Sequence, residues 1–176
     1  MKLEGLVNAS LCFPIGRSGR VLMGRKTRVI GVGLFNGPGG GIEDGETVDE
    51  GTVREVHQEV GITVNPKKLQ RRAIVRCNNF KKDGAPFVCK LYVSIAPEWE
   101  GAATPSDELV DLVWFLPQQL PLAQMMAGDQ SWVPQVLQGK TFTAEVWYAP
   151  GMQRLAQPTH IKPCTAEELL RSWVVP

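Results

Sequence analysis

The sequence has no long hydrophobic run and almost no excess of charge of either sign. No uninterrupted apolar stretch is long enough to span a bilayer, and the opening residues, MKLEGLVNAS, hold no long apolar segment, so we expect neither a membrane span nor a secretory signal. The formal net charge is +1, which argues against a surface for duplex nucleic acid. These absences favour a cytoplasmic protein, and they leave a monomer and a homodimer equally open.

Patterns of metal-binding histidine and cysteine are also missing. The two histidines and four cysteines have no zinc-ligand spacing, so we expect no zinc site. The cysteines are interpreted as reduced, mostly buried thiols of a reducing compartment: Cys12, Cys77, Cys89 and Cys164. With 176 residues, the chain is long enough for one packed domain and a small extension.

The most informative segment is residues 40–62, GGIEDGETVDEGTVREVHQEVGI. Thr47 and Glu50 form a T-x-x-E capping box, which predicts the start of a helix. Gly61 is a typical residue just past the end of a helix, and therefore predicts where it stops. An apolar stripe at helical spacing predicts packing against a core: Val53, Val56 and Val60.

Two acidic residues of this helix, Glu55 and Glu59, lie one turn apart, with Gln58 between them. Carboxylates held this close repel unless a positive charge lies between them, and a hard divalent cation such as Mg2+ takes oxygen ligands and phosphates. A solvated helix face is the usual alternative for this spacing. The preceding turn, Gly39–Gly41, favours the metal interpretation, because a glycine-rich turn entering a helix lets the backbone approach a metal and a phosphate.

The same segment fits the pattern G-x5-E-x7-R-E-U-x-E-E-x-G-U, where U is aliphatic, and so resembles the signature of the MutT-like Nudix hydrolases. The matching positions are Gly40, Glu46, Arg54, Glu55, Val56, Glu59, Gly61 and Ile62. One position departs, because Gln58 stands where the pattern has a glutamate. The resemblance implies an α+β fold, an α/β/α sandwich with a mixed central sheet and a loop–helix catalytic motif. It also implies hydrolysis of a nucleoside diphosphate linked to another moiety.

The resemblance further implies roles for individual residues. The expected catalytic residues are Glu55, Glu59 and Glu108. The expected ligands of Mg2+, with Mn2+ as an alternative, are Gly40, Glu55, Gln58, Glu59 and Glu108. Glu59 is the expected principal ligand, and a plain surface role is the alternative for Glu108. Glu46 and Arg54 should form an ion pair that braces the loop on the helix. Gln58 keeps a carbonyl oxygen but lacks the charge, so we expect weaker metal binding than with three glutamates.

Matches outside this segment, within residues 5–148, are similar to the branch of the family that hydrolyses oxidised purine nucleoside triphosphates such as 8-oxo-dGTP. They comprise Lys26 and the runs FNGPGG (35–40), SDE (106–108) and DQSW (129–132). The substrate-binding residues that they imply are Lys26, Asn36, Met126, Asp129 and Trp132. Three alternatives stay open: Asn36 as a turn residue, Asp129 as a helix cap, and Trp132 as core.

Three positions depart from that branch. Met126 stands at a stacking tryptophan, Gly128 at a second aspartate, and Ile30 at a phenylalanine. We therefore expect Mg2+-dependent hydrolysis of a nucleoside triphosphate to the monophosphate and pyrophosphate, and we expect the triphosphatase class more firmly than the oxidised base. Two alternatives are hydrolysis of ADP-ribose, a dinucleotide or capped RNA, and a catalytically silent nucleotide-binding module.

The remaining chain reads as strands with few helices. Strands are predicted over residues 3–13, 20–25, 69–78, 86–95, 110–116 and 141–149. One or two short helices are predicted within 118–139, broken around Gly128 and Pro134, and a terminal helix within 165–173. The expected organisation is a hydrolase domain over 1–149 and an extension over 150–176 that docks on the same domain.

Overall fold

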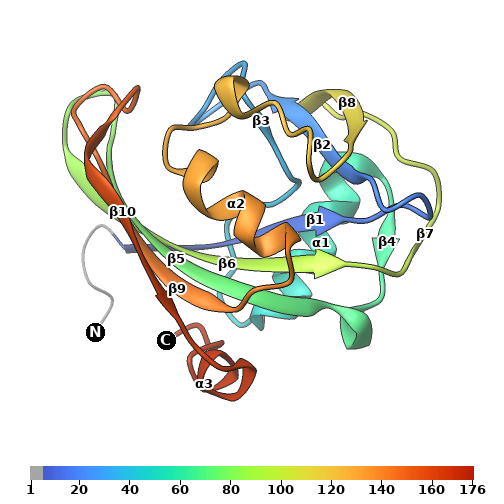
Figure 1. Cartoon of the computed structure of the whole chain (residues 1–176). Helices are drawn as coiled ribbons and strands as arrows, with labels where there is room; N and C mark the ends of the chain where they lie inside the picture. The colour runs from blue at the N-terminus through green and yellow to red at the C-terminus, as the bar shows by residue number, and fades with distance from the viewer. Residues whose placement is uncertain (1–5) are drawn as a thin grey trace.

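The computed structural model describes residues 6–176 (Figure 1). Its strands are β1 (Leu6–Pro14), β2 (Val21–Lys26), β3 (Phe35–Asn36), β4 (Thr63–Val64), β5 (Gln70–Phe80), β6 (Pro86–Ala96), β7 (Trp99–Glu100), β8 (Leu109–Phe115), β9 (Phe142–Tyr148) and β10 (Leu155–Pro163). Its helices are α1 (Val48–Val60), α2 (Asp129–Leu137) and α3 (Ala166–Arg171), with 3-10 turns at Pro66–Lys68 and Leu122–Gln124. The first residues of the predicted strand 3–13 and of the predicted domain lie outside the described residues.

The central sheet has five strands in the order β1-β6-β5-β9-β10 and is mixed. β1 pairs with β6 and β5 with β9 in parallel, whereas β5–β6 and β9–β10 are antiparallel. In Figure 1, α2 lies in front of this sheet and α1 behind it. Alternate residues of β5 serve the two layers, because Val75 packs with Trp132 of α2 while Ile74 packs with Val48 of α1. The predicted α/β/α sandwich is confirmed.

A smaller sheet has the strand order β3-β2-β8. Its strand β3 leads into the loop that precedes α1. This loop lies directly on β1, because the Ser10 amide donates to the Gly40 carbonyl at 2.8 Å and the Cys12 amide donates to the Pro38 carbonyl at 2.9 Å. A Cβ atom at Gly39 would lie 2.2 Å from the Ser10 carbonyl oxygen. Only glycine permits this approach, so the loop is fixed against the sheet by its composition.

Helix α1 forms as its sequence predicts. Thr47 and Glu50 make both bonds of the capping box, and Gly61 ends the helix with a φ of 73°. The valine stripe packs against the core, since Val56 and Val60 are buried and Val53 is partly buried beside them. The position of the motif therefore follows from signals within the motif itself.

The second half of the chain differs from the sequence-based prediction in two places. Helix α2 runs through Pro134 rather than breaking there. Proline removes one hydrogen bond from the helix interior, and the complete burial of Trp132, Val133 and Val136 on the same helix offsets this loss. Residues 155–163 form the edge strand β10 on β9, which was not among the predicted strands. Edge strands tolerate the proline and polar residues of this segment.

The terminal helix is present over Ala166–Arg171, shorter than predicted, and begins with its own capping box. Within residues 6–176 no helix is long and apolar enough to cross a membrane.

Candidate active site

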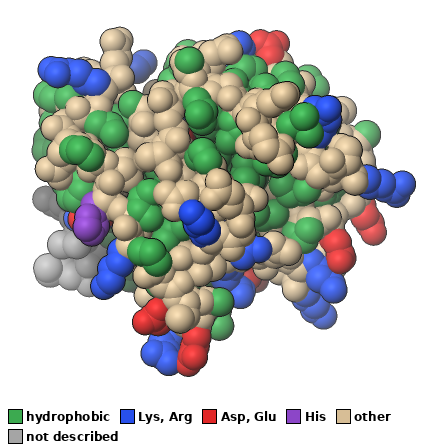
Figure 2. All heavy atoms as spheres, viewed as in Figure 1, with side chains coloured by type: hydrophobic (Ala, Val, Ile, Leu, Met, Phe, Trp, Pro, Cys, Tyr) green, Lys and Arg blue, Asp and Glu red, His purple; other side chains and the backbone are tan. Residues whose placement is uncertain are grey.

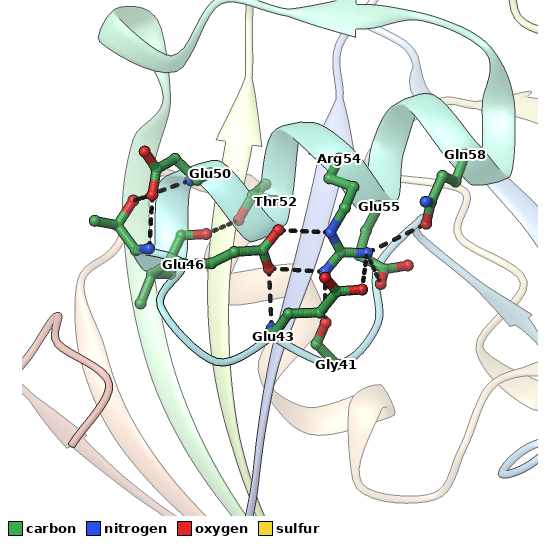
Figure 3. Close-up of polar contacts among 10 residues, drawn as sticks. Gly41, Glu43, Glu46, Glu50, Thr52, Arg54, Glu55 and Gln58 are labelled. Carbon is green, nitrogen blue, oxygen red and sulfur yellow. Dashed lines mark hydrogen bonds and ion pairs between the residues drawn. The ribbon is translucent and has the colours of Figure 1, made fainter.

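The guanidinium of Arg54 ties the loop to α1 (Figure 3). Its Nε donates to Glu46 Oε1 at 2.6 Å, and its Nη2 donates to Glu46 Oε2 at 2.8 Å and to the Gly41 carbonyl at 2.9 Å. The predicted ion pair is therefore present and is bidentate. Hydrogen bonding from Arg54 lowers the pKa of Glu46 to about 2, so Glu46 is ionised across the neutral range.

The same guanidinium reaches the next turn of the helix. Its Nη1 donates to Glu55 Oε1 at 2.6 Å and to Gln58 Oε1 at 3.2 Å. Gln58 is exposed, and Figure 3 shows its amide oxygen directed at Arg54. The side-chain oxygen of Gln58, which was predicted as a metal ligand, thus accepts a hydrogen bond from Arg54 in the structure.

Glu59 is the buried acid of the motif, with 6 % of its surface exposed. Its Oε2 accepts a hydrogen bond from the Gly39 amide at 2.9 Å. Burial raises the pKa of Glu59 to about 7, while the Gly39 bond and the charge of Lys26 oppose that rise. The charges of Glu55 and Glu108 raise the pKa further, so a positive charge supplied from outside would be stabilised here.

Gly40 faces Glu55 closely, since a Cβ atom on Gly40 would lie 2.5 Å from Glu55 Oε2. The Gly40 carbonyl accepts the Ser10 amide, and a carbonyl oxygen has a second lone pair for another partner. The Glu108 carboxylate pairs with Arg28, and its charge also acts on Glu59.

Among residues 6–176 no three His, Cys, Asp or Glu side chains gather closely enough to form a ready metal cage. The arrangement nevertheless fits a cation such as Mg2+, which is commonly bound through one or two carboxylates while water and phosphate oxygens complete its coordination. Glu59, Glu55 and the Gly40 carbonyl are donors of the required kind.

Asp129 is a second buried acid, at the start of α2. The residue at the helix cap is Gly128, and no side chain caps the helix, so the alternative of Asp129 as a cap is wrong. Burial raises the pKa of Asp129 to about 7, and the charge of Lys26 opposes the rise. Lys26 therefore acts electrostatically on both buried acids, a link that the sequence did not reveal.

The other predicted substrate-binding residues differ in burial and in hydrogen bonding. Trp132 is completely buried in the core, as its alternative proposed, yet its Nε1 has no hydrogen-bond partner among the described residues. Met126 is buried, and a Cβ atom on Gly31 would lie 2.9 Å from its sulfur. Asn36 Oδ1 accepts the Gly37 amide at 2.9 Å, which is the turn interaction proposed as its alternative.

A groove of about 950 Å³ adjoins Met126 on the α2 side of the molecule. Hydrophobic side chains are exposed over this side (Figure 2). The groove lies between residues 29–34, the β5–β6 turn, residues 123–130 and the β9–β10 turn. Its apolar wall includes Phe80, Phe87, Met125 and Met152. No local sequence signal could assemble four separate segments into one groove.

Comparison with known proteins gives matches of three kinds. A family model described as the NUDIX domain matches residues 5–136. The oxidized purine nucleoside triphosphate hydrolase of Mus musculus is 34% identical over 123 residues, which are 70% of this chain and 75% of the relative. That of Danio rerio is 35% identical over 126 residues, 70% of this chain and 76% of the relative. The structure of a mutator MutT protein from Bacillus halodurans superposes with a TM-score of 0.73 at 25% identity, covering 90% of this chain and 99% of that one.

The lowered pKa of Glu46 predicts an acid-dependent contribution to stability. Because the folded pKa is about 2 against an ordinary 4.5, the contribution is complete above pH 4.5 and is lost as the pH falls toward 2. Glu46→Gln should lower the free energy of unfolding at pH 7 by about 1–2 kcal/mol, and the deficit should shrink toward pH 3. Denaturant titrations at several pH values measure this.

Glu43→Gln is the matched control, because Glu43 is exposed and lies 3.9 Å from Arg54. A deficit in Glu46→Gln that is the same at pH 7 and pH 3 would show that the ion pair does not stabilise the loop.

Proposed function

Because the chain belongs to the Nudix hydrolase family, we propose that it hydrolyses a purine nucleoside triphosphate, with oxidised purines such as 8-oxo-dGTP among its substrates, to the monophosphate and pyrophosphate. Nudix hydrolases generally require divalent metal ions, and the ion proposed here is Mg2+, with Mn2+ as the alternative. The observation that carries the proposal is the buried Glu59 carboxylate, fixed by Gly39 beside Glu55 in a braced loop–helix motif. We further propose a cytoplasmic enzyme, monomeric or homodimeric, without a duplex nucleic acid partner.

Glu59, Glu55 and the Gly40 carbonyl are the proposed ligands. When bound there, a divalent cation would supply positive charge to phosphate oxygens and would make a bound water more acidic. The Gly39 amide orients Glu59, and Arg54 holds Glu55 in place. Glu108, which pairs with Arg28 through Oε1, is proposed as base or outer ligand through its second oxygen or after that pair opens.

The proposed base site is formed by Asp129, Asn36, Met126 and Trp132, with Lys26 between it and the motif. A carboxyl group with a pKa near neutrality can donate a hydrogen bond when protonated and accept one when ionised, so Asp129 suits a purine edge. The indole N–H of Trp132 also lacks a partner among the described residues. It is completely buried, so it could donate to a base only if the core opened beside it.

This protein should discriminate less strongly between oxidised and ordinary purines than a site in which two aspartates contact the base. A Cβ atom at Gly128 would lie 2.7 Å from Val146 Cγ1 and 2.8 Å from Tyr148 Oη, so this position has no room for the second aspartate. Strong rejection of a related substrate depends on buried polar groups that it would leave unpaired. The names of the two relatives support oxidised purines, and the single carboxyl supports a broader purine range.

Replacement of Glu59 tests the proposal directly. Glu59→Gln should lower kcat by at least about a hundredfold, because it removes the anionic ligand from the motif. The fold should persist, since an amide is easier to bury than a carboxylate. Steady-state kinetics and thermal melting measure both effects. Glu100→Gln, on the exposed end of β7, is the control, and a Glu59→Gln enzyme that keeps half of wild-type turnover at saturating Mg2+ would refute the assignment.

Gln58→Glu should lower the Mg2+ concentration that gives half-maximal rate, by about two- to fivefold. A carboxylate at this position restores the missing negative charge on the helix face of Glu55 and Glu59, while Arg54, which now binds Glu55 and Gln58 together, can still hold both side chains. Gln58→Ala removes the same hydrogen bond without adding charge and should not lower the requirement. An unchanged metal dependence in Gln58→Glu would show that position 58 does not influence the ion.

Asp129→Ala should reduce kcat/KM for purine triphosphates more than for pyrimidine triphosphates. A lost hydrogen bond to a buried base edge costs about 1–3 kcal/mol, or roughly five- to a hundred-and-fifty-fold. Asp129→Asn keeps the shape and should show a smaller change in the same direction. If both variants keep the wild-type purine-to-pyrimidine ratio, Asp129 does not read the base.

A further inference from the structure

The C-terminal segment, residues 164–176, contacts the first turn of the catalytic helix. Trp173 Nε1 donates to Asp49 Oδ1 at 3.1 Å. Arg71 of β5 donates to the other oxygen of the same carboxylate at 2.5 Å. The Asp49 side chain is thus held by the sheet and by the C-terminal segment together, near the N-terminus of α1.

A small apolar core surrounds this contact. Its buried members are Val48, Ile74, Tyr92, Leu169 and Trp173, and Ile42, Cys164 and Val175 pack against them. The Tyr92 and Trp173 rings meet edge to face, with centroids 5.4 Å apart, and the Tyr92 hydroxyl donates to the Val174 carbonyl. Because Ile42 comes from the catalytic loop and Val48 from α1, the C-terminal segment packs on both halves of the motif.

The C-terminal segment lies beyond residues 5–136, the part of the chain that the family model matches. Within the motif, Arg54 joins the loop to the helix, and β1 binds the loop through backbone hydrogen bonds. The C-terminal segment adds a third support at the start of the helix, so a shift there would move Glu55 and Glu59 relative to Gly40.

We propose that residues 164–176 act as a clamp that positions the catalytic helix, with Trp173 and Asp49 as positioning residues. The proposal rests on the proposed function, and it extends the expectation that residues 150–176 dock on a hydrolase domain formed by residues 1–149. Neither residue is placed in the base site, which lies on the α2 side of the sheet. Loss of the clamp should therefore weaken metal use and turnover while leaving affinity for the base unchanged.

The test uses the full chain with Trp173→Ala, Trp173→Phe and Asp49→Asn. Leu170→Ala is the matched control, because Leu170 lies in the same C-terminal segment, on α3, and is 52% exposed. For each variant one measures kcat, the Mg2+ concentration for half-maximal rate, and the Kd of GMP without metal. Trp173→Ala should lower kcat and raise the Mg2+ requirement about tenfold or more, because misplacement by about 1 Å can cost a hundredfold in rate. Its Kd for GMP should stay within about twofold of wild type, as expected for an unaltered, preformed base site.

Trp173→Phe keeps an aromatic ring but loses the N–H to Asp49, so its effects should be smaller and in the same direction. A folded Trp173→Ala with wild-type kcat and Mg2+ dependence would overturn the clamp. If Trp173→Ala does not fold, unchanged metal dependence in both Trp173→Phe and Asp49→Asn would overturn it instead.

Failure of the proposed function is distinguishable. If the wild-type chain hydrolyses no nucleotide, amide hydrogen exchange still tests the clamp. Exchange in residues 48–52 should be faster in Trp173→Ala than in Leu170→Ala, while β5 and β6 remain protected. Equal exchange in the two variants would overturn the clamp whatever the activity of the chain.

Discussion

The rest of the site depends on the hydrogen bonds that the Arg54 guanidinium makes between the loop and α1. The guanidinium binds Glu46 and the Gly41 carbonyl on the loop, and Glu55 on the helix. A second link between loop and helix is the hydrogen bond from the Gly39 amide to Glu59. With both links, Gly40 lies so close to the Glu55 carboxylate that no side chain fits between them. The oxygen atoms proposed to hold a cation are therefore brought together before any ligand arrives.

Two buried acids and one lysine connect this motif to the proposed base site. Burial raises the pKa of Glu59 and of Asp129 to about 7, and in both cases the charge of Lys26 opposes the effect. Burying an acid without a strong partner costs stability. Ligand binding can offset this cost at both positions. A cation at Glu59 would supply a positive charge, and a base at Asp129 would supply a hydrogen-bond partner.

The loop–helix motif could be predicted from the sequence because its signals are local. The capping box, Gly61 and the valine stripe all lie within α1 or beside it. The contact of Trp173 with Asp49 joins residues 124 positions apart, and no periodicity reports such a pairing. Strand β10 was missed because an edge strand need not alternate polar and apolar residues. The partner of Gln58 was missed because spacing places a residue on a helix face but does not say whether a neighbouring arginine takes its oxygen.

Product analysis of the wild-type chain shows whether it is a metal-dependent purine triphosphatase. Purine and pyrimidine triphosphates and ADP-ribose would be incubated with and without Mg2+, and the phosphorus-containing products identified. We expect monophosphate and pyrophosphate from purine triphosphates, only in the presence of a divalent cation. Release of orthophosphate and a diphosphate, cleavage of ADP-ribose in preference to every triphosphate, or tight nucleotide binding without turnover at any metal concentration would contradict it.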